Sequence, residues 1–579
     1  MNQIIKQIVG SFIIIILLNS CGLFGIHIHV HNPRIAGRYS KVSKEKAMLG
    51  ELNSLRKSYD VTFYGLDIFL DPDKKEINGW VEIKTTVINQ LDTLLLDLDQ
   101  PLKIDEIRLD SREGKLLNYS RKYRNVYVKL PSTATSGTSF SVHVKYHGKP
   151  IIARKPPWSG GLVWKKDKQK HPWCGVACEA EGASVWLPCK DHTSDEPDSA
   201  KMRFTISDTS LMVVSNGIFT GSENHTNSKS FNWKVSYPIN LYNITFYLGN
   251  FQKIEDSYTG INGKVLNITH YVLKPNALIA EKHFKRVKNH LRVYEELYGE
   301  YCWYKDGFKL VESPYKGMEH QSAIAYGNGY RNDLNGLDDY IMLHETGHEW
   351  FGNAISVADL ADVWLQEGVT TYGEYLYLEK EQTEFAAKSH LLFYRLTIKN
   401  KRPVVGPVNR RYFNYKDGDV YVKGAWTLHT LRNQINNDSI FLQIMRTFYE
   451  ENKLKTTDSK TFISTVNRVT GKNYNWLLDQ YLYERKVPFI QYEVVDGKTL
   501  YYRWVAVKDD FNQLTVPFKM PGAVDKTRIT PSVLVQKLEM PEGTKLDKHF
   551  RFDNSEALFG IKKNKKLSKI YRKESKPKN

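Results

Sequence analysis

Five consecutive residues, His344-Glu345-Thr346-Gly347-His348, constrain the fold more than any other part of the chain. They lie in an amphipathic segment, 337–351, with Asn335 as candidate cap and Gly352 as candidate stop, and this pattern predicts a helix. Four residues advance a helix by about 400°, so the two histidines lie on one face at neighbouring turns, where they can share a metal ion. Glu345 then lies alongside, placed to act as a base rather than as a ligand.

A third ligand is offered by Glu367, nineteen residues after His348 and near the start of the next predicted helix, 365–380. Two histidines and one glutamate with an open fourth position are typical of catalytic zinc. We therefore predict one Zn2+ per chain, held by His344, His348 and Glu367. Glu374 follows Glu367 by two turns on the same face, where it either holds the outer nitrogen of a ligand imidazole or is an ordinary surface carboxylate.

The first 21 residues have the pattern of an export signal. Lys6 supplies the positive charge, 12–18 are apolar, and small residues surround Cys21. The segment resembles a bacterial lipoprotein signal, which implies cleavage before Cys21 and a lipid on its sulfur. The alternative is an uncleaved membrane anchor formed by 8–24. In both cases we expect a chain of the cell envelope that is attached to a membrane at its N-terminus.

Residue patterning divides the rest of the chain into an all-β part, a mostly helical part and a second all-β part. Alternating short runs predict strands up to about residue 252, and longer amphipathic stretches at 278–298, 337–351, 365–380 and 426–436 predict helices. Alternation then returns after 481 over a length that fits a small β-sandwich. The predicted segments are a signal at 1–21, a tether at 22–55, a β domain at 56–255, a catalytic domain at 256–488, a C-terminal β domain at 489–562 and a basic tail at 563–579.

Composition excludes several classes of protein. With 41% hydrophobic and 25% charged residues the chain is neither disordered nor a multi-span membrane protein. The net charge is +18, and nine Lys or Arg and one Glu in 562–579 contribute +8 of it. This tail is predicted to be a solvated, flexible end that can lie on an anionic membrane. Without a basic helix or zinc-finger spacing, we expect no nucleic-acid partner.

Four cysteines remain beyond Cys21, namely Cys174, Cys178, Cys189 and Cys302. In an exported chain an even number is compatible with one or two disulfides, although the sequence does not give their pairing. A structural zinc site at the first three is the alternative, but its spacing lacks a convincing fourth ligand.

Upstream of the histidine pair, Gly317-Met318-Glu319-His320 looks like the G-x-M-E-N signature of the aminopeptidase N and leukotriene hydrolase family of zinc metallopeptidases. Other elements of that family are matched in the expected order between residues 56 and 488. They are Cys178-Glu179-Ala180 for Q-x-E, Leu187 to Asp191 for P-C-x-D, Tyr421 to Gly424 for Y-x-K-G, and Gln480 to Pro488 for the end of the catalytic domain.

The resemblance implies a multidomain α+β fold with an N-terminal all-β saddle-like domain, a thermolysin-like catalytic domain and a small C-terminal β-sandwich. It further implies a zinc-dependent aminopeptidase whose substrates are peptides with a free N-terminus. Glu319, beside Gly317 and Met318 on a predicted edge strand, would bind the α-ammonium, and Glu179 would close on it from the β domain. Tyr421 would donate a hydrogen bond to the oxyanion.

The chain departs from the family at four positions. His320 replaces the signature asparagine and could add a positive charge beside the amine at low pH. Ala177 replaces the usual glutamine, and Gln366 the usual asparagine before the third ligand. These departures leave open how the amine site and the first side-chain pocket are altered. Phe413 stands where the epoxide-hydrolysing branch has an acidic residue, so that activity is not expected.

Two other functions fit parts of the pattern. A thermolysin-like endopeptidase would share the zinc site but has no use for two amine-binding carboxylates. A non-catalytic peptide-binding surface protein on the same fold would be expected to lose Glu345 or a ligand, and none is lost. The sequence does not give the preferred first residue, the physiological peptide or the oligomeric state.

Overall fold

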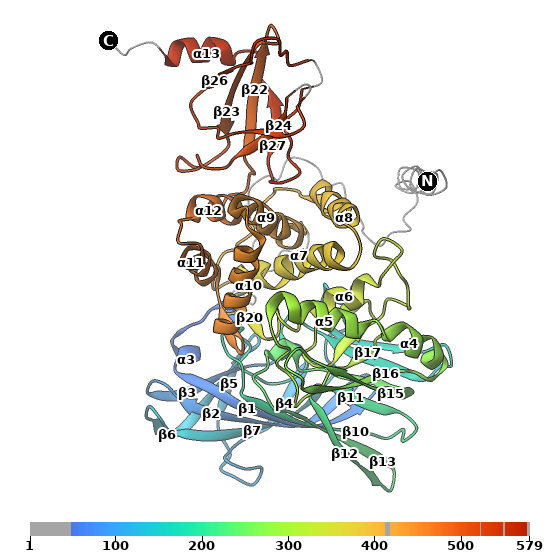
Figure 1. Cartoon of the computed structure of the whole chain (residues 1–579). Helices are drawn as coiled ribbons and strands as arrows, with labels where there is room; N and C mark the ends of the chain where they lie inside the picture. The colour runs from blue at the N-terminus through green and yellow to red at the C-terminus, as the bar shows by residue number, and fades with distance from the viewer. Residues whose placement is uncertain (1–47, 412–416, 521–522, 548–549, 576–579) are drawn as a thin grey trace. The chain divides into compact units, whose positions relative to one another are not determined.

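The computed structural model describes residues 48–411, 417–520, 523–547 and 550–575 (Figure 1). The predicted signal, Cys21 and most of the predicted tether lie outside these residues, as does Phe413. Among the described residues, no helix combines the length and the apolar character needed to cross a bilayer.

The first part of the chain is all-β, as its alternating pattern predicts. In β1 and β2 the alternation of apolar and polar residues buries about every second side chain, and a turn at 72–75 joins the two strands. The elements are α3 (Ser54–Lys57), β1 (Tyr59–Asp71), β2 (Glu76–Val87), β3 (Leu91–Asp97), β4 (Leu102–Leu109), β5 (Tyr119–Lys122), β6 (Asn125–Ala134), β7 (Ser139–Gly148), β8 (Gly161–Lys166), β9 (Pro172–Ala177), β10 (Ser199–Ile206), β11 (Met212–Ser215), β12 (Ile218–His225), β13 (Ser228–Val235) and β14 (Phe246–Gly249).

These strands form three sheets. The largest has seven strands in the order β12-β13-β10-β1-β2-β7-β4, in which β1 and β10 are parallel. A four-stranded sheet has the order β11-β14-β9-β8, and a three-stranded sheet the order β3-β6-β5. The segments that follow β9 and precede β14 carry Glu179 and Tyr242, which the site uses.

A five-stranded sheet and a group of helices follow. The sheet has the order β15-β16-β17-β19-β18, so β18 is an edge strand. The elements are β15 (Phe251–Thr259), β16 (Val265–Leu273), α4 (Ala277–Phe284), α5 (Val287–Tyr298), β17 (Leu310–Glu312), β18 (Gly317–Met318), β19 (Ile324–Tyr326), α6 (Tyr340–Gly347), β20 (Ile355–Val357), α7 (Trp364–Glu381), α8 (Glu384–Thr397), α9 (Asp419–Ile435), α10 (Asp438–Asn452), β21 (Lys455–Thr457), α11 (Ser459–Thr470) and α12 (Asn475–Tyr483).

Two glycines bring α7 and α9 together. A Cβ atom built on Gly368 would lie 2.9 Å from the Cα atom of Gly424, and one on Gly424 would lie 3.0 Å from the Cα atom of Gly368. Any larger side chain at either position would push the helices apart. Because Gly368 follows Glu367 and Gly424 lies one turn after Tyr421, this contact holds the start of α7 close to the start of α9.

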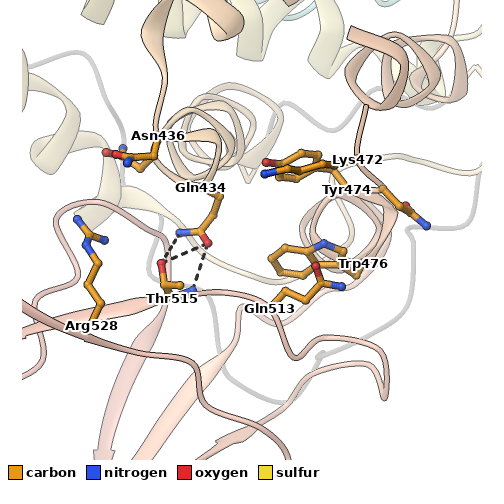
Figure 2. A pocket seen from close by; sticks show the side chains of 10 residues that line it. Gln434, Asn436, Lys472, Tyr474, Trp476, Gln513, Thr515 and Arg528 are labelled. Carbon is orange, nitrogen blue, oxygen red and sulfur yellow. Dashed lines mark hydrogen bonds between the residues drawn. The ribbon is translucent and has the colours of Figure 1, made fainter. Parts of the chain in front are cut away.

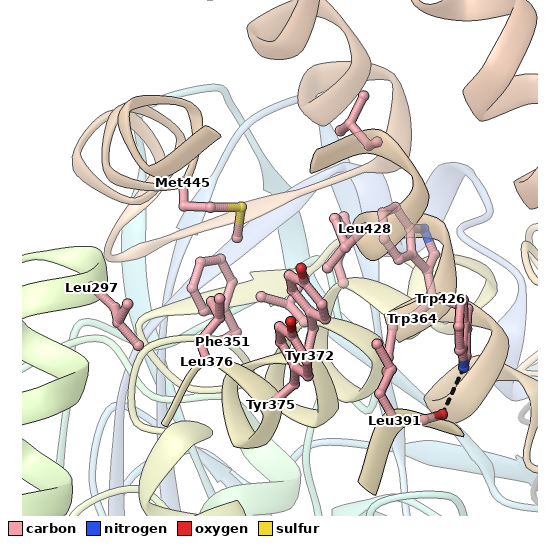
Figure 3. Packing of buried hydrophobic residues seen from close by; sticks show 14 of the residues in the cluster. Leu297, Phe351, Trp364, Tyr372, Tyr375, Leu376, Leu391, Trp426, Leu428 and Met445 are labelled. Carbon is pink, nitrogen blue, oxygen red and sulfur yellow. Dashed lines mark hydrogen bonds between the residues drawn. The ribbon is translucent and has the colours of Figure 1, made fainter. Parts of the chain in front are cut away.

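A continuous apolar core surrounds this crossing (Figure 3). The side chains of Trp364 and Trp426 are almost completely buried, and the Trp426 indole N–H donates to the carbonyl oxygen of Leu391 at 2.9 Å. Aromatic side chains of this size each bury a large apolar area, so the helices that position the site are firmly held.

The last part of the chain returns to strands, as predicted. A four-stranded sheet has the order β26-β23-β22-β27, and β24 pairs with β25. The elements are β22 (Phe489–Val495), β23 (Thr499–Val505), β24 (Val516–Lys519), β25 (Lys526–Ile529), β26 (Gln536–Glu539), β27 (Gly560–Lys563) and α13 (Leu567–Glu574). The fold class expected from the sequence is confirmed, whereas the predicted domain boundaries stay predictions.

A polar pocket of about 340 Å³ lies where the end of α9 meets the C-terminal β region (Figure 2). Across it the Thr515 backbone N–H donates to Gln434 Oε1 at 3.1 Å, and Gln434 Nε2 donates to Thr515 Oγ1 at 3.3 Å. The described residues that line this pocket include no carboxylate. The hydrogen bonds across the pocket join these two parts of the chain.

Helix limits differ from the sequence predictions in three places. The helix predicted at 426–436 is α9, which already begins at Asp419. The stretch 278–298 forms two helices, α4 and α5, and at the break between them the Arg286 side chain donates to the carbonyl oxygen of His283 at 3.0 Å. The helix with the histidine pair begins after Asp339 rather than after Asn335 and ends at Gly347. Asp339 caps it because its carboxylate accepts from the Met342 N–H at 3.1 Å.

The expectation of a flexible basic tail is wrong for 567–574. This segment forms α13, whose Leu567 side chain is buried and whose Tyr571 ring lies 5.5 Å from the ring of Tyr501. Two apolar contacts at helical spacing therefore hold a strongly basic segment against the β region.

The cysteines also differ from the expectation of disulfides. Cys174, Cys178, Cys189 and Cys302 are free in the described chain. None of them belongs to a group of possible metal ligands among the described residues. Three are buried in the β domain, where burial raises the pKa of the Cys174 thiol to about 12. They act as small apolar core residues.

Candidate active site and metal centre

His344 in α6 and His348, which directly follows this helix, face each other across one helical turn, as their spacing predicts. Their Nε2 atoms are 3.1 Å apart, and both side chains are buried. The helix begins at Asp339, whose carboxylate also contacts His283 Nε2 at 2.8 Å and accepts from the Tyr326 hydroxyl at 2.6 Å. Asp339 therefore fixes the start of the helix to the neighbouring helix and sheet.

Glu367 on α7 completes a group of three possible ligands. Its Oε2 atom lies 3.6 Å from His344 Nε2 and 3.3 Å from His348 Nε2. The ligand atoms of the three residues all lie within 4.8 Å of one another. Glu367 Oε2 is buried and has no hydrogen-bond partner among the described residues. A buried carboxylate oxygen without a donor is costly unless a cation binds there.

Outer contacts determine which imidazole nitrogens carry protons. His344 Nδ1 lies 2.7 Å from Glu374 Oε1, and His348 Nδ1 lies 2.8 Å from the carbonyl oxygen of Phe351. Both contacts require a proton on Nδ1, so the Nε2 lone pairs of the two rings point toward each other and toward Glu367. Three facing lone pairs repel in the absence of a cation, and these donor types suit zinc.

Glu374 is a contact of the ligand His344, and two further residues that the sequence did not reveal hold it. Glu374 Oε2 accepts from His390 Nε2 at 2.9 Å and from the Tyr394 hydroxyl at 2.6 Å. Both residues lie on α8, which packs on α7. The surface-carboxylate alternative for Glu374 is wrong, because its side chain is 0% exposed.

A second group, Glu319, Glu345 and His348, also has its ligand atoms within 4.8 Å of one another. It shares His348 with the first group and lies in the same pocket. Glu319 Oε1 already accepts a hydrogen bond from the Tyr242 hydroxyl at 3.0 Å, whereas Glu367 Oε2 has no donor. The first group is therefore the better cation site.

Glu345 lies against the edge strand β18. A Cβ atom on Gly317 would lie 2.4 Å from Glu345 Oε1 and 2.8 Å from Ile341 Cγ2, so a larger residue there would require these side chains to shift. Burial raises the pKa of Glu345 to about 7. A cation beside it would stabilise the ionised form and lower this pKa again, which keeps the carboxylate able to accept a proton near neutral pH.

Glu319 follows β18 and is held by a pair of residues that sequence reasoning missed. The Tyr242 hydroxyl donates to Glu319 and accepts from Gln366 Nε2 at 2.9 Å. Burial raises the pKa of Glu319. Tyr242 lies 77 residues before Glu319, so no local pattern connects the two. The one sequence feature connected with this contact was Gln366, which departs from the family pattern.

Glu179 reaches the same pocket from the loop after β9. This loop is fixed by Arg411, which donates to the carbonyl oxygen of Ala180 at 3.3 Å and pairs with Asp191 at 3.0 Å. Gly182 has φ +85°, and a Cβ atom there would lie 2.0 Å from Arg411 Nη2. The loop that carries Glu179 thus depends on a glycine and a buried ion pair.

Tyr421 lies in the first turn of α9 and is half-buried. Its ring stacks on the ring of His344, with centroids 6.3 Å apart and planes inclined by 28°. Tyr421, Met318 and Gly317 line one pocket with the ligand residues, Glu345, Glu319 and Glu179. The structure thus brings together all the site residues that the sequence suggested.

A family model described as "Peptidase family M1 domain" matches residues 284–481, which include the three candidate ligands, Glu345, Glu319 and Tyr421. The chain therefore contains a peptidase family M1 domain. Solved M1 structures share its fold. The zinc metallopeptidase from Deinococcus radiodurans aligns with a TM-score of 0.64 at 20% identity, covering 74% of this chain and 94% of that one. Yeast LTA4 hydrolase aligns with a TM-score of 0.63 at 20% identity, covering 78% of this chain and 71% of that one.

Curated relatives of this chain include leucine aminopeptidases and a leukotriene A-4 hydrolase. Leucine aminopeptidase 2 of Ajellomyces capsulatus is 24% identical over 58% of this chain and 53% of its own length. Leukotriene A-4 hydrolase of Xenopus laevis is 24% identical over 49% of this chain and 46% of its own length. The chain therefore spans about half the length of these relatives.

His320 does not act as the sequence suggested. Its Nδ1 atom lies 2.6 Å from the Tyr247 hydroxyl, and burial lowers its pKa to about 3. His320 is therefore neutral near neutral pH and adds no positive charge at the amine site there. Ala177 is buried at the end of β9.

In the M1 signature the glycine stands two residues before the methionine, a position that Lys316 rather than Gly317 holds here.

Proposed function

We propose that this chain is a zinc-dependent aminopeptidase that removes the first residue from peptides with a free N-terminus. The observation that supports this most is one buried pocket that combines a three-ligand cation site with two further carboxylates, Glu319 and Glu179. An endopeptidase needs the cation site but not the additional carboxylates. The leucine aminopeptidases among the relatives support the same function.

Zinc bound by His344, His348 and Glu367 would supply the Lewis acidity that activates water and polarises the peptide carbonyl. Glu345 accepts the proton of the attacking water and passes it to the leaving amine. Tyr421 donates its phenolic proton in a hydrogen bond to the oxyanion that forms.

The two other carboxylates select the end of the chain. Glu319 and Glu179 bind the α-ammonium of the substrate and so set which peptide bond reaches Glu345. A blocked N-terminus would bring no ammonium to these carboxylates and would bury an uncharged group against them, and this costs far more than the loss of one exposed contact.

We expect the wild-type enzyme to hydrolyse a short peptide with a free N-terminus at least about 100-fold faster than its N-acetylated form. Glu319→Ala should reduce this ratio, mainly by slowing hydrolysis of the free peptide. The measurement is kcat/KM for both peptides with both enzymes. Equal cleavage of the two forms by the wild type would favour the endopeptidase alternative.

Tyr242→Phe tests the same preference with a smaller change beside Glu319. It removes the hydroxyl that donates to Glu319 and accepts from Gln366, while the ring is retained. The ratio should fall by about three- to tenfold, the usual scale of the net contribution of one hydrogen bond. Tyr258→Phe is the matched control, because its hydroxyl donates to Glu295 at 2.7 Å and does not line the pocket.

Tyr421→Phe is expected to lower kcat by about ten- to a hundredfold with little change in KM, because the hydroxyl acts mainly on the oxyanion. Tyr375→Phe should leave both constants near wild type, since that hydroxyl contacts Glu379 at 2.9 Å. Steady-state kinetics on a free-ended peptide gives both values. If Tyr421→Phe raised KM alone, Tyr421 would be a binding residue.

We also propose that the N-terminal segment attaches the enzyme to a membrane of the cell envelope, through lipid on Cys21 or as an uncleaved anchor. The sequence pattern of residues 1–21 supports this proposal. Mass spectrometry of the mature N-terminus, with Cys21→Ala as the comparison, distinguishes a lipidated cysteine from an uncleaved anchor.

A further inference from the structure

The pocket contains one positively charged side chain that the proposed mechanism does not use. Among the described residues that line it, Lys316 is the only lysine or arginine, beside the carboxylates Glu179, Glu319, Glu345 and Glu367. Its side chain is exposed, and its Nζ atom lies 5.6 Å from the centroid of the Tyr340 ring. In the part of the chain that the structure describes, its ammonium group contacts this ring and pairs with no carboxylate. This ammonium group is therefore available to a ligand.

The position of Lys316 follows from the order of residues along the edge strand. Glu319 marks the amine site, and Gly317 lies against Glu345, so the strand passes from the amine site to the general base and then to Lys316. The carbonyl oxygen of Lys316 accepts from the Gly327 N–H at 2.8 Å, which keeps this end of the strand in place. At about 3.3 Å per residue, Lys316 lies about 10 Å from Glu319 along the strand.

Tyr340 lies on the same side of the site as Lys316. It lies one turn before His344 on α6, and its ring stacks on the His344 ring with centroids 5.6 Å apart. The Lys316 Nζ atom lies over the ring of the same Tyr340. A peptide whose ammonium is at Glu319 and whose first carbonyl is beside Glu345 therefore continues toward Lys316 with its second and third residues.

We propose that Lys316 binds a substrate carboxylate one or two residues beyond the scissile bond, an inference that rests on the proposed aminopeptidase function. The preferred substrates are peptides with a positive charge at the first nitrogen and a negative charge shortly after the cleaved bond. Two sources supply such a carboxylate: an Asp or Glu side chain at the second or third residue, and the C-terminus of a di- or tripeptide. Electrostatic complementarity of this kind sets specificity more than overall affinity.

The experiment compares peptides that differ in one carboxylate. For the side-chain source, Ala-Glu-Ala-amide is compared with Ala-Gln-Ala-amide, and Ala-Ala-Glu-amide with Ala-Ala-Gln-amide. For the terminal source, Ala-Ala and Ala-Ala-Ala are compared with their C-terminal amides. We expect kcat/KM to be about three- to tenfold higher for the carboxylate member of at least one pair at low ionic strength, and the ratio to shrink at high salt.

Variants of Lys316 test whether this side chain causes the preference. Lys316→Met should bring the ratio close to one, Lys316→Arg should retain it, and Lys316→Glu should invert it. Lys305→Met is the matched control, because Lys305 is also exposed, also lies over a tyrosine ring, that of Tyr237 at 5.8 Å, and does not line the pocket. Its ratio should equal that of the wild type.

A binding measurement separates failure of this inference from failure of the proposed function. Calorimetry with the zinc-loaded Glu345→Gln variant gives the affinity ratio for each peptide pair without turnover, with and without Lys316→Met. If the wild type hydrolyses none of the free-ended amides, the proposed function is wrong, and the affinity ratios still test Lys316. The inference is overturned if every pair has a ratio near one, or if Lys316→Met leaves the ratios unchanged.

Discussion

Replacing Glu345 by Gln is expected to lower kcat by at least about 100-fold, and by up to about 10,000-fold, while one zinc ion stays bound. The amide has nearly the shape of the carboxylate but cannot accept the proton of the attacking water. Glu345 is not one of the three best-placed ligands, so the metal content should not change. The measurement is steady-state kinetics on a free-ended peptide together with metal analysis of the same sample.

Glu349→Gln is the matched control for this prediction. Glu349 lies one turn later and is equally buried, but its carboxylate accepts from the Ser322 N–H at 2.9 Å and the Tyr301 hydroxyl at 3.0 Å instead of lining the pocket. Burial raises its pKa to about 7, so the amide resembles its protonated form. If both variants lost turnover equally, the effect would reflect the loss of a buried charge rather than of a general base.

Local periodicity made the metal centre predictable. His344 and His348 share a helix, and Glu367 and Glu374 share the next one, so a spacing of four or seven residues was enough to state which side chains face the same way. The contact between Glu374 and His344 at 2.7 Å needed only the further condition that the two helices cross at this point.

Contacts between distant segments were not predictable from a single sequence. His390 and Tyr394 reach Glu374 because α8 packs on α7, and Tyr242 reaches Glu319 from the β domain. No spacing rule connects such pairs, because their separation in the chain depends on how whole elements pack.

Burial also decided the roles that the sequence left open. An imidazole at position 320 is cationic or neutral according to its surroundings, and only the structure shows that it lies against Tyr247 in a site that favours the neutral form. In the same way, Asp339 rather than Asn335 starts α6 because it also contacts His283 and Tyr326, which lie elsewhere in the chain.

The glycines of two motifs have a physical explanation in the fold. Gly368 follows the third ligand and Gly424 ends the element that begins with Tyr421, and each leaves space for the backbone of the other. The sequence contains both motifs but not the reason for their glycines. Close contact of α7 and α9 at these glycines is what holds Glu367 and Tyr421 near the same imidazoles.

Removal of zinc is expected to abolish hydrolysis and to lower the melting temperature by several degrees. Without a cation, Glu367 Oε2 is left buried with no donor, and two imidazole lone pairs face each other at 3.1 Å. A ligand that binds only the folded state at about 1,000 times its Kd contributes about 4 kcal/mol to the free energy of unfolding. Calorimetry before and after chelation, with zinc added back, measures this effect.

Two substitutions in the site should reduce zinc binding to different extents. Glu367→Gln removes a ligand charge and should leave zinc well below one per chain, whereas Glu374→Gln keeps all three ligands and should weaken zinc binding by about 10- to 100-fold. Both variants change one buried glutamate on α7, so a general effect of lost charge on that helix would affect them alike. Only a metal centre at His344, His348 and Glu367 predicts a larger loss of zinc for the first variant than for the second. A wild-type protein that contains almost no zinc, and whose activity and melting temperature do not respond to chelators, would contradict the assignment.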